Sequence, residues 1–186
     1  MRENHNSSLV FKGTLFNIIR EPYIAIDGSV EYFEFAETND VVRVYPVTDH
    51  GKLLLISEDR YGIAPDSISK VLRVVSGAIE PNESPEAAAI RELGEEIGFS
   101  GENPVIFHTS YPMLKVRSKV FHVLVKAKGL LEVGPQPDRF EHIKMIPLKI
   151  EDVEAKVWNG DFAEDIVAFG LLKMLHYLHS KEYAGT

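Results

Sequence analysis

The first 80 residues contain short runs in which apolar and polar side chains alternate, a pattern typical of half-buried β-strands. Asp27-Gly28 interrupts one such region and is a strong signal for a tight hairpin turn. A second turn is predicted at residues 48–51, between two further apolar runs. The strands predicted before the first helix therefore lie within residues 10–35, 41–47, 53–56 and 71–79.

Residues 84–98 carry the start and stop signals of a helix. Ser84 can cap the first free amides, and Pro85 suits the first helical position. Gly98 is a natural C-terminal stop, so we expect the helix to end near Ile97.

The second half of the chain is predicted to form strands at 106–109, 120–125 and 143–148, and a long helix at 162–178. This order of elements predicts an α+β fold with a mixed β-sheet and helices packed on its faces, such as an α/β/α sandwich. The strand-rich segment 1–38 is predicted to form an N-terminal β extension, either a small separate sheet or a dimerisation arm. Residues 39–186 would form the main domain.

Composition excludes several classes of protein. Of the 186 residues 45% are hydrophobic, which is enough for a packed core. The net charge of −8 provides no general attraction for nucleic acid, and we expect no nucleic-acid partner. Cysteine is absent, which excludes disulfides and thiolate metal sites. Because no apolar run reaches the ~18 residues of a membrane span, we expect no membrane association. The absence of cysteine fits a reducing cytoplasm, where we expect the protein to be located.

Four carboxylates are concentrated around the predicted helix at 84–98. Glu92, Glu95 and Glu96 share one helical face, and Glu83 can fold back over the first turn. Carboxylates this close repel one another unless a cation lies among them, and hard oxygen ligands suit Mg²⁺, with Mn²⁺ as an alternative. The cluster therefore predicts a divalent-metal site that faces a negatively charged group, most simply a phosphate.

Three neighbouring residues complete this predicted site. Arg91 precedes Glu95 by one helical turn and can pair with it, which would leave the other carboxylates for metal. Gly77 allows the backbone to approach a ligand closely, and the carbonyl of Ser76 is a possible extra metal ligand. A pair of glutamates on a helix is usually only solvated surface charge, so the whole constellation carries the hypothesis.

Residues 77–99, GAIEPNESPEAAAIRELGEEIGF, resemble the Nudix box at every specified position, although Phe99 is aromatic where an aliphatic residue is commoner. The resemblance implies a Nudix α/β/α sandwich that hydrolyses a nucleoside diphosphate linked to another group. It implies that Glu92 and Glu96 are the main metal ligands, while Glu83 and Glu95 assist. Arg91 would orient the carboxylates, one of which helps water to attack phosphorus.

Outside the box the chain resembles the branch of ADP-ribose pyrophosphatases, with RVYPVTDHGKLLLISEDRYG before the box and SYPMLKVRSKVFHVLV after it. This resemblance implies a substrate such as ADP-ribose or a related nucleoside diphosphate sugar. It implies substrate contacts at Arg60 and near Pro112, and a homodimer that shares the N-terminal arm. It also implies a catalytic base in a late loop, where Glu141 fits better than Asp138.

Two departures from the branch bear on the substrate. Arg73 stands where an acidic residue is usual, and we expect it to contact the substrate. Beyond Pro112, an acidic residue is usual, whereas this chain has Lys115, Arg117 and Lys119, which either meet a phosphate or an acidic sugar or merely protect a strand edge. Two alternatives stay open. One is a Nudix hydrolase of oxidised nucleoside triphosphates or dinucleoside polyphosphates, and the other is a non-catalytic binding module.

Overall fold

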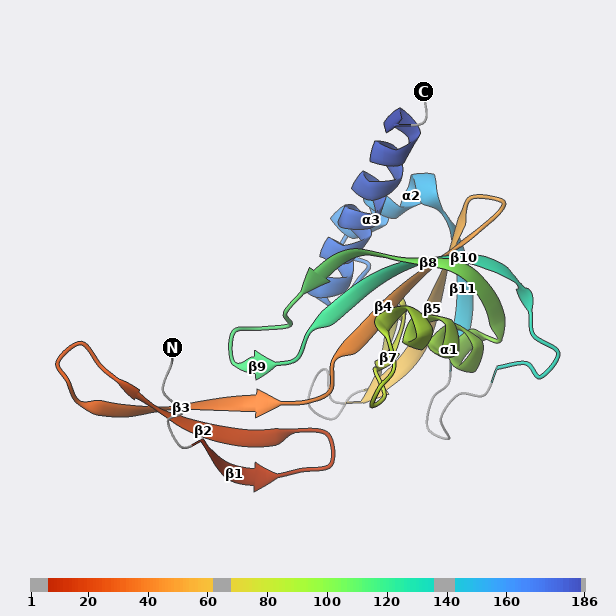
Figure 1. The fold of residues 1–186 in the computed structure, drawn as a ribbon. Coiled ribbons are helices and arrows are strands. Elements are labelled where there is room, and N and C mark those ends of the chain that lie inside the picture. The colour runs from red at the N-terminus through yellow and green to blue at the C-terminus, as the bar shows by residue number, and fades with distance from the viewer. Residues whose placement is uncertain (1–6, 62–67, 136–142, 185–186) are drawn as a thin grey trace.

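The computed structural model describes residues 7–61, 68–135 and 143–184 of the chain (Figure 1). Its elements, in chain order, are β1 (Ser8–Lys12), β2 (Asn17–Ile24), β3 (Val30–Glu37), β4 (Val41–Thr48), β5 (Lys52–Tyr61), β6 (Ile68–Arg73), β7 (Val75–Ala78), α1 (Pro85–Ile97), β8 (Phe99–Ser110), β9 (Val116–Arg117), β10 (Val120–Leu130), β11 (Ile143–Lys149), α2 (Ile150–Trp158) and α3 (Asp165–Ala184).

Within these described residues, the main sheet has seven strands. Five of them follow the order β11-β5-β4-β10-β8, while β6 pairs with β5 and β7 pairs with β4. The β4–β10 pair is parallel and the other pairs are antiparallel, so the sheet is mixed. The predicted α+β fold with a mixed sheet is thereby confirmed.

Alternation along the central strands divides the core into two layers. Val42 and Val44 of β4 point to one face, where they pack with α1 residues such as Leu93. Tyr45 points to the opposite face, where it packs with α2 and α3 residues such as Leu171. Because successive side chains of a strand face opposite sides, this one strand contributes to both cores. The result is a sandwich with α1 on one side of the sheet and α2 with α3 on the other.

A buried polar chain crosses the α3 side of the sheet. The Tyr45 hydroxyl lies 2.7 Å from His122 Nδ1, and the Ser110 hydroxyl lies 2.9 Å from His122 Nε2. Gly170 of α3 packs directly against this chain, because a β-carbon there would lie 1.9 Å from the Tyr45 hydroxyl oxygen. Burial lowers the pKa of His122 to about 4, with the positive charges of His108 and Arg43 acting in the same direction.

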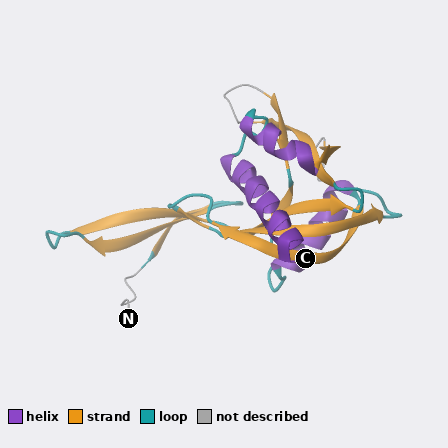
Figure 2. Ribbon diagram, turned by 90° about the horizontal axis from the view of Figure 1, so that it is seen from above, coloured by secondary structure: helices purple, strands orange, loops and turns teal. Residues whose placement is uncertain are grey.

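Strands β1, β2 and β3 form an antiparallel arm that extends away from the main sheet and its helices (Figure 2). The predicted hairpin turn is confirmed: Gly28 has φ +84° and its N–H donates to the carbonyl of Ala25. Strand β9 pairs in parallel with β3 through Ala36–Val116 and Glu37–Arg117, which attaches the arm to the loop between β8 and β10.

The structure departs from the predicted elements in several places. The predicted strand at 71–79 is divided into β6, which pairs with β5, and β7, which pairs with β4. Strand β9 was not predicted, and α3 spans Asp165–Ala184 instead of 162–178. Helix α2 was not predicted, since it has nine residues and its N-cap is Lys149, which makes no side-chain capping bond. Strand β8 begins at Phe99, directly after α1, and is therefore longer than the predicted strand at 106–109. Among the described residues, no helix is both long enough and apolar enough to cross a membrane.

Candidate active site

Helix α1 presents the predicted carboxylates, and its ends are those the sequence predicted. The Ser84 hydroxyl accepts a hydrogen bond from the N–H of Ala87 at 3.1 Å, and Pro85 begins the helix. Gly98 ends the helix with φ 69°, a left-handed conformation that suits glycine. These caps fix the helical register, so that the side chains of Glu92 and Glu96 face the sheet and are largely buried.

Arg91 is the centre of the carboxylate cluster. Its guanidinium donates to Glu83 at 2.9 Å, to Glu92 Oε1 at 2.7 Å and to Glu95 Oε2 at 2.8 Å. It also donates to the carbonyl of Ala78 at 2.9 Å, which ties the helix to β7. The predicted pair with Glu95 is therefore present. Arg91 also pairs with Glu83 and Glu92, because its five N–H groups reach three carboxylates at once. That the other carboxylates serve a metal stays a prediction.

The electrostatics of this cluster are uneven. Hydrogen bonds from Arg91 lower the pKa of Glu83. Glu92 behaves differently: burial raises its pKa, and the bond from Arg91 only partly opposes that effect. Three carboxylates, including Glu95, thus share one guanidinium, so this group of side chains carries an excess of negative charge in a partly buried position.

Gly77 lies directly against Glu92. A β-carbon at position 77 would stand 1.9 Å from Glu92 Oε1 and 2.0 Å from its carboxyl carbon, a separation that no real side chain permits. The sequence predicted that Gly77 allows a ligand to approach the backbone. In the structure the Glu92 carboxylate occupies this space. It can pack directly against the backbone of β7 because glycine has no side chain.

Arg73, expected to contact the substrate, is placed in the interior and is only 2% exposed. Its Nε donates to Glu58 Oε2 at 2.5 Å and its Nη2 donates to Glu96 Oε1 at 3.1 Å. Its Nη1 donates to the Ser76 hydroxyl at 2.7 Å. Burial alone would lower the pKa of Arg73, but the charges of Glu96 and Glu58 outweigh that effect and raise it. In this arrangement Arg73 contacts the residues of the site from behind.

Glu58 is a residue of this site that sequence reasoning overlooked. It is 4% exposed and lies at the end of the alternation that buries Leu54 and Ile56 on the α1 side of the sheet. That period of two was visible in the sequence and would have placed Glu58 on the same face. A buried carboxylate requires a partner, and Arg73 provides one.

The donor set of the cluster fits a divalent cation. Glu92 and Glu96 are buried carboxylates on one helical face, and Glu83 and Glu95 flank them with oxygen donors, the ligand type that Mg²⁺ and Mn²⁺ prefer. Among the described residues, no three acidic or histidine side chains already converge at metal-ligand spacing. The carboxylates are instead turned towards Arg91 and Arg73.

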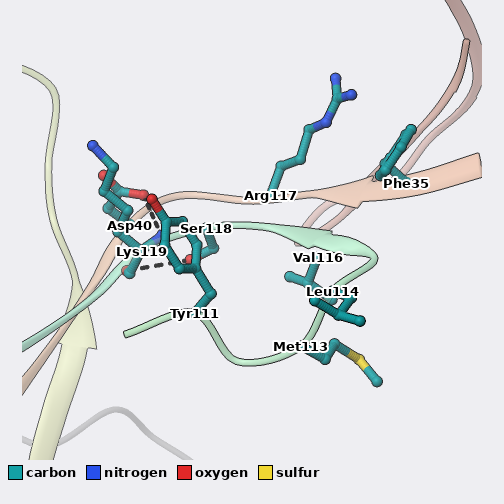
Figure 3. Close-up of a pocket in the computed structure, with 9 residues that line it drawn as sticks. All are labelled: Phe35, Asp40, Tyr111, Met113, Leu114, Val116, Arg117, Ser118 and Lys119. Atoms are coloured by element: carbon teal, nitrogen blue, oxygen red, sulfur yellow. Dashed lines mark hydrogen bonds between the residues drawn. The ribbon is translucent and has the colours of Figure 1, made fainter. Parts of the chain in front are cut away.

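A pocket of about 430 Å³ lies where the arm meets the loop between β8 and β10 (Figure 3). It is lined by Phe35, Asp40, Tyr111, Met113, Leu114, Val116, Arg117, Ser118 and Lys119. Asp40 Oδ1 accepts the N–H of Lys119 at 2.7 Å, and the Asp40 carbonyl accepts the N–H of Ile79 at 2.8 Å. Because Ile79 follows Gly77 by two residues, the pocket wall is joined to the backbone beside the carboxylate cluster.

The three basic residues after Pro112 have different surroundings. Lys115 is exposed, and its Nζ lies 5.9 Å from the ring centre of Phe33 in the arm. Arg117 forms two hydrogen bonds with Glu21 of the arm, at 2.7 and 2.5 Å, and its guanidinium lies 4.1 Å from the ring centre of Phe35. Lys119 is exposed and lines the pocket. Arg117 therefore attaches the arm, whereas Lys119 faces the space that a ligand could enter.

Other predicted residues are only partly covered by the structure. Pro112 is exposed in the segment between β8 and β9, next to the pocket residues Tyr111 and Met113. The side chain of Arg60, and the whole of Asp138 and Glu141, lie outside the described part of the chain. Their predicted roles as substrate contact and catalytic base therefore stay predictions.

Comparison with known proteins agrees with this geometry. A family model for the NUDIX domain matches residues 37–165. The chain is 24% identical over 174 residues to the ADP-ribose pyrophosphatase of Bacillus subtilis (strain 168). This alignment covers 93% of this chain and 90% of that protein. The chain is also 43% identical over 67 residues to the ADP-sugar pyrophosphatase of Mus musculus, covering 34% of this chain and 29% of that protein.

The fold also has a counterpart among solved structures. A crystal structure of an ADP compounds hydrolase aligns with a TM-score of 0.77 at 23% identity, covering 95% of this chain and 93% of that one. The matched family region contains β4, β7 and α1, the elements that assemble the carboxylates with Arg91 and Gly77. The chain therefore belongs to the Nudix family of pyrophosphohydrolases.

Proposed function

We propose that the protein hydrolyses the diphosphate bond of ADP-ribose or a related nucleoside diphosphate sugar, with Mg²⁺ or Mn²⁺ as cofactor. The products would be a nucleoside monophosphate and a sugar phosphate. The observation that carries this proposal is the cluster of Glu83, Glu92 and Glu95 around the single guanidinium of Arg91, next to the buried Glu96. The names of the two pyrophosphatases to which the chain is similar support the substrate class.

Glu92 and Glu96 would hold the divalent ion, with Glu83, Glu95 and the Ser76 carbonyl as further oxygen donors. When bound, the ion supplies positive charge against the diphosphate and makes a water molecule more acidic. Arg91 keeps the carboxylates in place through its bonds to three of them and to the Ala78 carbonyl.

The pocket beside Asp40 supports a substrate longer than a phosphate alone. Its apolar lining from Met113 and Leu114 suits a base or sugar face, and Lys119 supplies positive charge at its edge. The backbone bond between Asp40 and Ile79 joins this pocket to the cluster. We propose that the diphosphate lies at the carboxylates and that the remainder of the substrate extends towards the pocket and Pro112.

Arg60 and Glu141 complete the proposal from the sequence. Arg60 would contact a substrate oxyanion, since its fork of N–H groups matches the geometry of a phosphate. Glu141 would accept a proton from the attacking water, a role that a loop carboxylate can perform once the substrate is bound.

We further propose a homodimer in which the arm, residues 1–38, contacts a second copy. Many large apolar side chains of the arm are exposed in the single chain: Leu9, Val10, Phe11, Leu15, Phe16, Tyr23, Ile24, Ile26, Val30, Tyr32 and Phe33. So many exposed apolar side chains on one small sheet support an interaction surface there. Light scattering after gel filtration should give twice the chain mass, and Phe11→Glu should shift it towards the monomer. A monomeric wild-type protein would refute this part of the proposal.

A substrate panel tests the activity. Purified protein with Mg²⁺, and separately with Mn²⁺, is incubated with nucleoside diphosphate sugars, nucleoside triphosphates and dinucleoside polyphosphates, and the products are identified. Release of a nucleoside monophosphate and a sugar phosphate supports the proposal. Free pyrophosphate from a triphosphate would point to the other Nudix activity, and no hydrolysis of any compound would refute catalysis.

A further inference from the structure

Behind the carboxylate cluster, Arg73 and Glu58 form a buried charge pair. Arg73 is 2% exposed and Glu58 is 4% exposed, and they lie on the adjacent strands β6 and β5. A charged pair withdrawn from water in this way contributes little to stability, since the loss of hydration roughly cancels the attraction between the charges. Stabilisation of the fold therefore does not sufficiently explain why this pair is buried here.

Two further contacts of Arg73 point to the site, in addition to its bond to the carbonyl of Val74 at 3.3 Å. Besides Glu58, its guanidinium donates to Glu96 Oε1 at 3.1 Å and to the Ser76 hydroxyl at 2.7 Å. Glu96 belongs to α1, and Ser76 precedes the glycine that lies against Glu92. One planar, rigid fork thus connects β5, β7 and α1 at the place where the carboxylates are assembled.

We propose that Arg73, with Glu58 as its counter-charge, is a positioning residue that holds Glu96 and Ser76 of β7 in the orientation needed to bind a divalent cation. This inference rests on the proposed function, in which Glu96 is a metal ligand. In this role Arg73 would act through Glu96 and Ser76, without itself contacting the metal or the substrate. Glu58 places a second negative charge beside the guanidinium. The positive charge of Arg73 is therefore balanced by two carboxylates while its N–H group orients Glu96.

Residues that hydrogen-bond a metal ligand from behind commonly change metal affinity by about 10–100-fold when they are removed. A purely structural pair has no such effect once the fold is intact. Metal affinity, measured apart from stability and without nucleotide, therefore separates the two roles.

The decisive variant is the double substitution Glu58→Met and Arg73→Met. It removes both charges of the pair together, which a folded protein usually tolerates when the replacements are apolar and of similar volume. Mn²⁺ binding is titrated by calorimetry in the absence of nucleotide, and thermal unfolding is followed by circular dichroism. We expect a folded protein that binds Mn²⁺ about tenfold or more weakly than the wild type. Wild-type affinity in a folded double variant would overturn the proposal.

A control removes an exposed ion pair that lies away from the carboxylates. Lys156 and Asp161 lie 2.8 Å apart at the end of α2, on the opposite side of the sheet from α1. Lys156→Gln with Asp161→Asn should leave Mn²⁺ affinity unchanged. A loss of affinity as large as that of the double Met variant would show that any lost ion pair weakens binding, and would also overturn the proposal.

If the double Met variant does not fold, Arg73→Lys provides the test. Lysine keeps the positive charge but lacks the fork that reaches Glu58, Glu96 and Ser76 together. We expect weaker Mn²⁺ binding, a near-normal KM for the substrate at saturating metal, and recovery of kcat as Mn²⁺ is raised. Full Mn²⁺ affinity in this variant would contradict positioning by the fork.

The outcomes that would refute the role of Arg73 differ from those that would refute the proposed activity. A wild type that binds Mn²⁺ but hydrolyses none of the substrate panel would refute the activity, while the comparison of affinities still tests Arg73. A wild type that binds no divalent cation would overturn both.

Discussion

Gly77 and Glu92 are so close that the carboxylate occupies the space in which any larger residue would place its β-carbon. Gly77→Ala must therefore displace either β7 or the carboxylate. Because a displacement of about 1 Å at a reacting centre can cost about 100-fold in rate, we expect kcat to fall by roughly that factor. The atoms that the added carbon would meet all belong to the flexible end of Glu92, which can move, so the free energy of unfolding should change by only about 1 kcal/mol or less.

Gly129→Ala is the control for this substitution. A β-carbon at position 129 would meet no atom within 4 Å, so this variant should keep both activity and stability. Steady-state kinetics and urea unfolding of the two variants provide the comparison. A Gly77→Ala enzyme with wild-type kcat would mean that Glu92 moves aside without consequence, which contradicts its assignment as a main metal ligand.

Loss of a carboxylate from α1 should separate activity from stability. Glu92→Gln and Glu96→Gln each remove one negative charge at nearly constant volume, and we expect kcat to fall on the order of 100-fold or more. Burial raises the pKa of Glu92, so its charged form is costly in the folded state, and Glu92→Gln should unfold within about 1 kcal/mol of the wild type.

Glu86→Gln, in the first turn of the same helix, is the matched control and should retain normal turnover. Stopped assays with Mg²⁺ at several concentrations measure both kcat and the metal requirement. Near-normal kcat in Glu96→Gln would remove Glu96 from the set of metal ligands.

The start of α1 depends on one hydroxyl. Ser84→Ala removes the bond to the N–H of Ala87, and loss of such a cap costs about 1 kcal/mol. Urea unfolding should show this decrease in the free energy of unfolding. Ser180→Ala, near the exposed end of α3, should have a much smaller effect, and equal effects of the two substitutions would argue against a capping role for Ser84.

His122 should make stability fall at mildly acidic pH. Its pKa is about 4 in the folded protein and ~6.5 in the unfolded chain, so the unfolded chain binds a proton more readily between these values. The contribution of His122 is complete above pH 6.5 and is lost as pH falls towards 4. From pH 7 to pH 5 the free energy of unfolding should decrease by about 2 kcal/mol.

Urea unfolding of the wild type and of His122→Gln at both pH values isolates this contribution. The variant should lose less stability between pH 7 and pH 5, since glutamine does not titrate. His176→Gln changes an exposed histidine on α3 and should follow the wild type. Parallel pH profiles for the wild type and His122→Gln would show that His122 does not control the acid response.

The features that could be predicted from the sequence depend on residues that are close together along the chain. The caps of α1 at Ser84 and Gly98 and the turn at Gly28 are local signals, and the structure has all three. Helix α2 lacks such a signal, because Lys149 provides no side-chain cap. The local composition around it therefore gave no boundary to recognise.

Contacts between distant segments could not be predicted in the same way. Arg73 and Glu58 are 15 residues apart, and their bond depends on the register of β5 with β6. The sequence showed a cation where an acid is usual, but only the pairing of strands reveals that this cation faces inward. The same holds for Arg91, whose link to Glu83 spans eight residues and a turn.

Strand β9 contributes both to the attachment of the arm and to the lining of the pocket. It pairs with β3 of the arm, and its residues Val116 and Arg117 line the pocket beside Asp40. If the arm binds a second copy and the pocket binds substrate, as proposed, the two equilibria share this strand. Thermodynamic linkage then requires reciprocity: a ligand that orders β9 tightens the dimer to the same degree that dimer formation tightens the ligand.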